Sequence, residues 1–253
     1  MEDFETGHEL FDSLIDLKMG SFITVVDETY TESISFLEGL LSNQGRMPAY
    51  VLSLKNLDTR LQVVTIELKA LHDVNLEVSK FREKIRSGVI VHWYLPHLLL
   101  KEKEDSILQV LEHWSRQISG RSLVEFYVLP RDTFPSFEKK LQALTDGVIL
   151  LRVKRGENLY EPLFSFVRGS KPGFHLKEFP YRIQDGRLLI KWADAYTDRL
   201  PKKDDALRTI KEMARTNIYG LEVSSASPFK DQDLTIYDKL LFSQLVDKRL
   251  SDI

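Results

Sequence analysis

The sequence contains no cysteine, no apolar run of eighteen residues and, between Gly20 and Gly39, no glycine. The absence of cysteine excludes disulfide bonds, thiolate catalysis and zinc sites built on cysteine. The absence of a long apolar run excludes a membrane-spanning helix, and the acidic residues 1–5 lack the basic start of a secretory signal. We therefore expect a soluble, cytoplasmic protein without a membrane partner.

What the chain does contain is enough apolar sequence for a buried core, because 43% of its 253 residues are hydrophobic. The formal net charge of −3 conceals an uneven distribution. Residues 1–40 carry ten acidic side chains and one lysine, a net charge of −9, whereas residues 148–192 carry nine basic and four acidic side chains, a net charge of +5. This separation favours head-to-tail contact between copies or separate partners, with two solvated faces of one monomer as the alternative.

The stretch 21–38 organises the chain. An apolar run, Phe22–Val26, passes through a short polar segment into a helical pattern with apolar positions between Ile34 and Leu41. The pattern predicts a strand, a loop and a helix. In nucleotide-binding α/β proteins this loop is rich in glycine and surrounds phosphate groups, and here the loop has no glycine.

Apolar runs typical of strands alternate with helical patterns as far as residue 151, and hairpins follow. The expected strands are 22–26, 49–54, 61–68, 89–95, 123–129, 148–151, 163–167, 181–183 and 188–190. Helical patterns cover 34–41, 71–85, 101–119 and 134–144. Before the first strand, the segment between Leu10 and Leu17 is amphipathic. We expect an α/β fold whose central sheet is mostly parallel, flanked by helices and extended by antiparallel hairpins at one edge.

The pattern changes again after Trp192. Residues 204–216 and 234–250 have helical periodicity, and a Ser/Pro-rich break, Ser224–Pro228, separates them. We therefore predict two parts, a core of residues 1–192 and a helical C-terminal extension of residues 193–253. The last helix could pack on its own core, pack on a neighbour or leave a groove for a partner peptide.

Three short motifs in the second half carry a family resemblance. They are Asp146–Leu151, Val167–Ser170 and Phe179–Leu188, which are similar to "A-D-G-V-I-x-L", "K-M-R-G-S" and "P-F-x-I-x-D-x-G-I". Their order and spacing resemble the RecA-like ATPases, in particular the KaiC- and archaeal RadA-related branch, over residues 4–191. The resemblance implies a RecA-like core, and it predicts an archaeal member of that branch that has lost its phosphate-binding loop.

The differences from this branch all lie at the catalytic positions. Laid on G-x-x-x-x-G-K-[ST], the chain has Asp27 and Glu32 for the glycines, Ser33 for the lysine and Ile34 for the hydroxyl residue. The acidic positions at the ends of two strands fall on Leu54–Asn56 and His92–Tyr94, which contain no acid. The resemblance therefore predicts a chain that is not an ATPase and has no catalytic residue, cofactor or metal site.

Other chemical sites are weaker alternatives. His92 and His97 stand at an odd spacing, which in a strand places them on opposite faces and favours ordinary core or surface positions. The carboxylates of the 27–32 segment could serve acid–base chemistry or bind a divalent ion, as in an altered nucleotide hydrolase. Aromatic residues within the basic 148–192 segment could stack on nucleic-acid bases, as in a nucleic-acid-binding RadA paralogue, but a pI near 6.1 argues against nucleic acid.

The hypothesis that we favour is an ATP-independent interaction or regulatory protein. In RecA-like assemblies the loop face of one subunit meets a basic face of the next, where a lysine and an arginine two residues apart approach the nucleotide. Here those two positions are Phe166 and Arg168. We expect a protein or peptide partner and a homo-oligomer, with contacts made by six residues: Asp27, Glu28, Tyr30, Glu32, Arg168 and Lys171. An active KaiC- or RadA-like ATPase is the most concrete partner.

Overall fold

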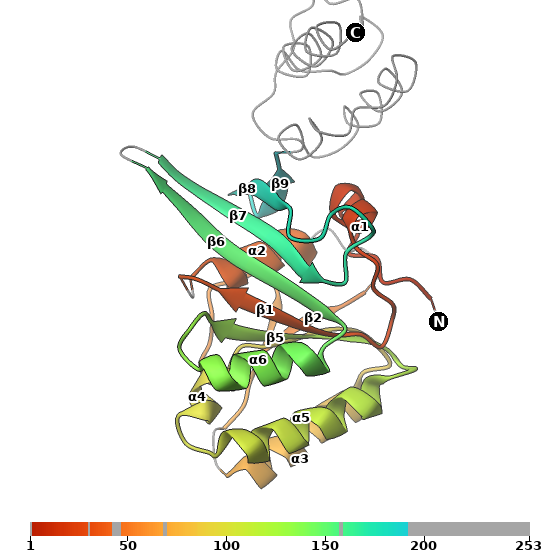
Figure 1. The fold of residues 1–253 in the computed structure, drawn as a ribbon. Helices are drawn as coiled ribbons and strands as arrows, with labels where there is room; N and C mark the ends of the chain where they lie inside the picture. Colours follow the sequence, from red (N-terminus) through yellow and green to blue (C-terminus); the bar gives the residue numbers. More distant parts are fainter. Residues whose placement is uncertain (1, 30, 42–46, 68–69, 157–158, 192–253) are drawn as a thin grey trace, which may run out of the picture.

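The computed structural model describes residues 2–29, 31–41, 47–67, 70–156 and 159–191. In these residues nine strands form one sheet in the order β3-β2-β4-β5-β1-β6-β7-β8-β9 (Figure 1). The strands are β1 Phe22–Asp27, β2 Ala49–Ser53, β3 Gln62–Thr65, β4 Ser87–His92, β5 Ser122–Pro130, β6 Gly147–Gly156, β7 Leu159–Arg168, β8 Glu178–Gln184 and β9 Arg187–Ile190.

The sheet has a parallel part and an antiparallel part. The first six strands in this order, from β3 to β6, pair in parallel. Strands β7, β8 and β9 then continue the sheet with antiparallel pairing. The predicted α/β class, with a mostly parallel sheet and antiparallel hairpins at one edge, is confirmed.

Helices cover both faces of the sheet, so that two apolar cores form, one on each face. On one face lie α3 Leu71–Lys84, α5 Glu104–Ile118 and α6 Pro135–Leu144, with the short helix α4 Leu95–Leu99 beside β5. On the other face lie α1 Glu9–Leu14 and α2 Glu32–Leu41. Strand β1 lies between these layers, and all six of its residues are buried.

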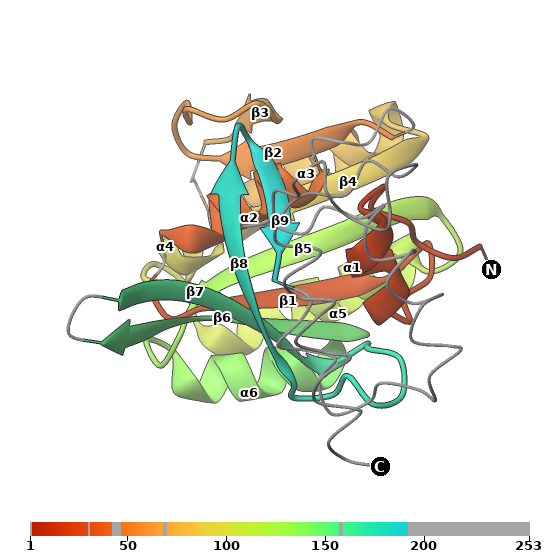
Figure 2. The same ribbon diagram turned by 90° about the horizontal axis from the view of Figure 1, so that it is seen from above.

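The β8–β9 hairpin turns over α2 instead of continuing flat (Figure 2). The contact is close at Gly39, because a Cβ atom added there would lie 2.9 Å from the backbone nitrogen of Leu188. A glycine on the outer face of α2 therefore lets the hairpin backbone reach the helix. On the same side, the ring of Tyr181 on β8 packs against Phe36 of α2.

Two segments differ from the expected pattern. Trp93–Leu95 does not continue β4, because Pro96 stands in the first turn of α4, where a proline needs no backbone donor. Strands β6 and β7 form one long hairpin over residues 147–168, although only 148–151 and 163–167 were expected as strands. The outer part of the hairpin extends beyond the apolar sheet (Figure 1) and contains the charged residues Arg152, Lys154 and Glu161. Because of these residues, the sequence shows no apolar strand pattern there.

The predicted helical extension, residues 193–253, and the predicted boundary at 192 lie outside the described residues. In the part of the chain that the structure describes, no helix is long and apolar enough to cross a membrane.

Candidate functional site

The loop between β1 and α2 holds the carboxylates that the sequence singled out. Asp27 is buried at the end of β1. Its Oδ1 atom accepts hydrogen bonds from the backbone nitrogen and the hydroxyl of Thr29, at 2.9 and 3.1 Å, and its Oδ2 atom accepts one from the backbone nitrogen of Ser33, at 2.8 Å. The carboxylate therefore accepts the hydrogen bonds of the backbone amides at the start of α2, where the positive end of the helix dipole stabilises an anion.

The two glutamates of this loop bind the β6–β7 hairpin of the same chain. Glu28 is exposed, and its Oε2 atom accepts a hydrogen bond from the backbone nitrogen of Val153 at 3.1 Å. The Oε1 atom of Glu32 accepts one from the hydroxyl of Tyr160 at 2.8 Å. The acidic loop and the hairpin are thus joined in cis. Tyr30 lies outside the described residues.

The two predicted basic partners lie elsewhere. The Arg168 guanidinium donates to the carbonyl of Thr145 at 2.9 Å, just after α6, and the Lys171 ammonium donates to the carbonyl of Asp12 at 3.1 Å. Arg168 pairs with Val148 on β6, whereas Asp27 pairs with Leu151. The separation along β6 is three residues, or about 10 Å, so the structure does not bring these acids and bases together within one chain.

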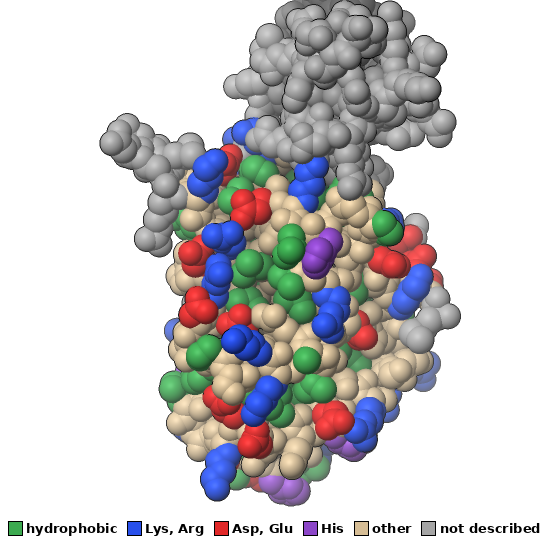
Figure 3. Space-filling view, in the orientation of Figure 1, with side chains coloured by type: hydrophobic (Ala, Val, Ile, Leu, Met, Phe, Trp, Pro, Cys, Tyr) green, Lys and Arg blue, Asp and Glu red, His purple; other side chains and the backbone are tan. Residues whose placement is uncertain are grey.

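The face of the molecule seen in Figure 3 has lysine and arginine side chains intermingled with aspartate and glutamate side chains. The uneven distribution of charge along the sequence therefore does not divide this face into an acidic half and a basic half.

Two hydroxyl groups near the acidic loop, Ser33 Oγ and Tyr181 Oη, are buried and have no hydrogen-bond partner among the described residues. The Tyr181 ring packs edge-on against Phe36, at a centroid distance of 5.1 Å, one turn beyond Ser33 on α2. Burial raises the pKa of the Tyr181 hydroxyl, and the negative charges of Glu32 and Asp27 raise it further. Tyr181 is therefore a neutral hydroxyl beside the two carboxylates.

A second polar cluster, not anticipated as a site, lies within the sheet under α3 and α5. Glu125, on β5, is fully buried and forms a bidentate ion pair with Arg82, on α3, with Nε–Oε1 and Nη2–Oε2 distances of 2.5 Å. It also accepts hydrogen bonds from the hydroxyl of Tyr127 and from Nε2 of His92, the latter at 3.0 Å. The hydroxyl of Tyr94 then lies 3.1 Å from Nδ1 of His92.

At the centre of the cluster, Arg82 and Glu125 form a buried ion pair. Burial alone would raise the pKa of the Glu125 carboxyl, but the charge of Arg82 and the hydrogen bonds from Arg82 and His92 hold it well below its usual range. Burial lowers the pKa of His92. The Glu125 carboxylate can only accept a hydrogen bond from Nε2, and the Tyr94 hydroxyl can donate one to Nδ1. We therefore assign His92 as the neutral imidazole that carries its proton on Nε2.

This cluster makes the stability of the protein sensitive to acid. The fold lowers the pKa of His92, so the contribution of His92 to the free energy of unfolding is complete above its ordinary pKa of 6.5 and is lost as the pH falls below 6.5. The fold also lowers the pKa of Glu125, so its contribution is lost as the pH falls below its ordinary pKa of 4.5. We expect the free energy of unfolding, measured by urea titration with tryptophan fluorescence, to fall by up to about 1.4 kcal/mol per pH unit between pH 6.5 and 4.5, and by up to about twice that below pH 4.5. His92→Gln should flatten the interval between pH 6.5 and 4.5. An identical pH profile in this variant would contradict the assignment.

In the ranges that the structure describes, no group of three or more His, Asp or Glu side chains converges as metal ligands would. His92 is a core residue, which is one of the two positions expected for it, whereas His97 lies on α4 and not on a strand. The sequence contains a signal of the Arg82–Glu125 pair. Glu125 stands inside an apolar strand, and Arg82 stands in helical phase with the buried residues Val74 and Val78.

No protein-family model matches the chain. No curated protein matches it. Among solved structures, it is similar to a KaiC-like protein from the hyperthermophilic archaeon Pyrococcus horikoshii OT3, with a TM-score of 0.61 and 13% sequence identity. The match covers 75% of this chain and 98% of that protein. At this identity the similarity establishes the fold, which is the RecA-like, KaiC-related fold that the motifs predicted.

Proposed function

We propose that this chain is a RecA-like protein that works without ATP, as a subunit that binds or regulates another protein. Its partner class is a protein or peptide, and the most concrete partner is an active KaiC- or RadA-like ATPase. In this proposal the chain is an archaeal relative of such ATPases that has lost the phosphate-binding loop, and it is not an enzyme.

The observation that supports this proposal best is the position of the Asp27 carboxylate. A phosphate-binding loop needs backbone amides that are free to surround the phosphate groups. In this chain the amides of Thr29 and Ser33 already donate to Asp27. An incoming phosphate would have to displace a buried carboxylate and would also meet its negative charge, which costs about 1 kcal/mol or more per close pair of unit charges even at the screening of water.

The remaining catalytic positions support the same proposal. The end of β2 leads into Leu54–Asn56, and the end of β4 leads through His92 to Trp93 and Tyr94, so neither position supplies an acid for magnesium or for an attacking water. His92 itself is fully buried and bound to Glu125. It is therefore part of the core and not available to a ligand at the edge of the sheet.

The surface that we assign to a partner is the acidic loop together with its neighbour, the β6–β7 hairpin. Glu28 and Tyr160 are exposed there. The basic residues Arg168 and Lys171 lie apart from this loop, as a head-to-tail contact between two chains would require. We propose such a contact, with a second copy or a related ATPase subunit, in place of the contact that ATP makes in active relatives.

The test is thermal unfolding of the full chain in the presence of magnesium and ATP, and of magnesium and ADP. A ligand at one hundred times its dissociation constant adds about 2.7 kcal/mol of stability, which corresponds to roughly 5–10 °C for a chain of this size. We expect no shift with either nucleotide, while an active KaiC-like ATPase measured in parallel shifts. A saturable shift of this chain would refute the proposal and would favour an altered nucleotide-binding enzyme.

A further inference from the structure

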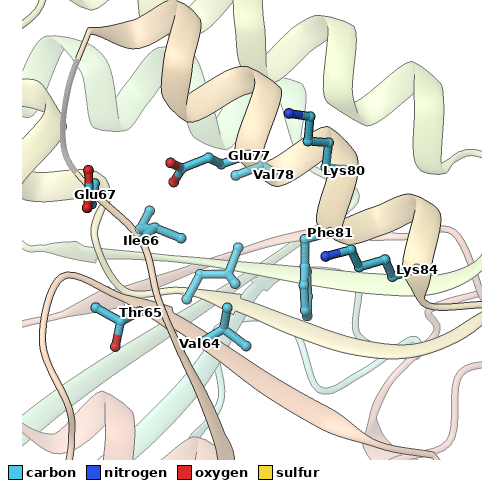
Figure 4. Close-up of a pocket in the computed structure, with 10 residues that line it drawn as sticks. Val64, Thr65, Ile66, Glu67, Glu77, Val78, Lys80, Phe81 and Lys84 are labelled. Atoms are coloured by element: carbon cyan, nitrogen blue, oxygen red, sulfur yellow. The ribbon is translucent and has the colours of Figure 1, made fainter.

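The acidic loop between β1 and α2 carries negative charge that no neighbouring base balances. In the ranges that the structure describes, Asp27, Glu28 and Glu32 form no ion pair. The hollow of about 420 Å³ between β3 and α3 is different, because two glutamates and two lysines line it together: Glu67, Glu77, Lys80 and Lys84 (Figure 4). Charge therefore selects a cationic ligand at the acidic loop, whereas the balanced charges of the hollow favour neither sign.

The two buried hydroxyl groups beside these carboxylates, Ser33 Oγ and Tyr181 Oη, have no hydrogen-bond partner within the described ranges. The backbone nitrogen of Ser33 donates to Asp27 at 2.8 Å, so the Ser33 side chain begins next to that carboxylate. The Tyr181 ring packs on Phe36, one turn further along α2. Burial raises the pKa of the Tyr181 hydroxyl, and the nearby charges of Glu32 and Asp27 raise it further. A buried hydroxyl without a partner is unfavourable, so both groups indicate a ligand that supplies the missing hydrogen bonds.

The acceptor atoms at this loop suit an ammonium group. A hydroxyl can donate or accept a hydrogen bond, but the adjacent carboxylates only accept, and they repel an anion. Both oxygens of Asp27 and Oε1 of Glu32 already accept hydrogen bonds, so neither carboxylate presents two unoccupied oxygens to the planar fork of a guanidinium. An ammonium nitrogen directs three N–H groups to separate oxygens at about 2.8 Å, and it can therefore join acceptors that lie too far apart to bond one another.

We propose that Glu32, Ser33 and Tyr181 bind a primary ammonium group beside Asp27. The ammonium donates to Oε2 of Glu32 and to the two unpartnered hydroxyl oxygens, and the buried Asp27 carboxylate adds its negative charge. A lysine side chain of a partner protein and a free polyamine present the same group. This inference rests on the proposed function, in which the acidic loop contacts a partner, and it names the group that the loop recognises.

The test is a titration of the full, ¹⁵N-labelled chain at low salt, in which NMR follows the backbone amide signals of Thr29 and Ser33. The probes are the peptide acetyl-Gly-Ser-Lys-Ser-Gly-amide and spermidine. We expect saturable shifts of both signals with the peptide, and binding at least about tenfold weaker when its lysine is Nε-acetylated, because acetylation removes the charge. Binding of the peptide identifies a lysine side chain as the source of the ammonium, whereas binding of spermidine alone identifies a free polyamine.

Two variants test the residues of the site. Tyr181→Phe removes the unpartnered hydroxyl and keeps the ring on Phe36, so it should weaken binding about tenfold without lowering the midpoint of urea unfolding. Glu32→Gln removes the charge and should weaken binding by a similar factor. The matched control is Glu83→Gln, which removes an exposed carboxylate on α3, on the other face of the sheet, and should leave binding unchanged.

Three results would overturn this inference: no binding of either probe, equal binding of the lysine and acetyl-lysine peptides, or binding that both Tyr181→Phe and Glu32→Gln leave unaltered. None of them bears on the proposed function, which is tested by thermal unfolding with nucleotide. A chain that ATP and ADP leave unshifted remains independent of nucleotide when neither probe binds, and a chain that nucleotide stabilises refutes the proposed function whatever the probes do.

Discussion

Replacing Glu125 by glutamine is expected to lower the free energy of unfolding by about 3–5 kcal/mol, the largest effect that we predict for a single side chain. The carboxylate is fully buried and is paired with the Arg82 guanidinium, which also lies 4.5 Å from the centre of the Trp114 ring. Glutamine would keep the volume and remove the charge, so that Arg82 would remain as a buried cation without a counter-ion. Urea unfolding followed by tryptophan fluorescence measures the loss.

Two further variants separate the buried charge from the general cost of substitution. The double variant Arg82→Met/Glu125→Gln removes both charges and should be more stable than Glu125→Gln alone, because no unpaired ion is left in the core. Glu112→Gln breaks an arginine–glutamate pair on the exposed face of α5 and should cost at most about 0.5 kcal/mol. A loss below about 1 kcal/mol for Glu125→Gln, or no recovery in the double variant, would contradict the ion-pair interpretation.

The sequence predicted the sheet well because its strands are distinct apolar runs. Phe22–Val26 and Leu123–Leu129 have few polar residues, since both faces of their strands are covered by helices. The alternation of these runs with helical patterns also specified a parallel sheet. The inner strands of the β6–β7 hairpin were predicted, but its outer half was missed because that half has no apolar face to bury, so its strand pairing leaves no periodic signal around Lys154.

The candidate site was predicted in part. The position of Asp27 at the end of β1 followed from the local pattern. The hydrogen bonds that join Glu28 to Val153 and Glu32 to Tyr160 could not be predicted, because they depend on a hairpin that lies more than a hundred residues later in the chain. The charged positions of Arg82 and Glu125 in apolar patterns were visible in the sequence, but their pairing was missed because it depends on the register of α3 over β5.

Replacing Asp27 by alanine is expected to lower the free energy of unfolding by about 2–3 kcal/mol, because three hydrogen bonds to a buried carboxylate are lost and the amides of Thr29 and Ser33 are left without an acceptor. Asp27→Asn should lose about half as much, since its amide oxygen can still accept from Thr29 while its NH₂ group cannot accept from Ser33. The same urea titration measures both variants.

Glu28→Ala is the matched control, because this neighbouring carboxylate is exposed and accepts one hydrogen bond, from Val153; we expect a change of about 0.5 kcal/mol or less. The comparison decides what Asp27 does in the loop. A carboxylate kept only for a partner would be neutral or destabilising to the isolated chain, so that Asp27→Ala would be as stable as the wild type. A loss that is large for Asp27 and small for Glu28 means that the Asp27 carboxylate stabilises the start of α2.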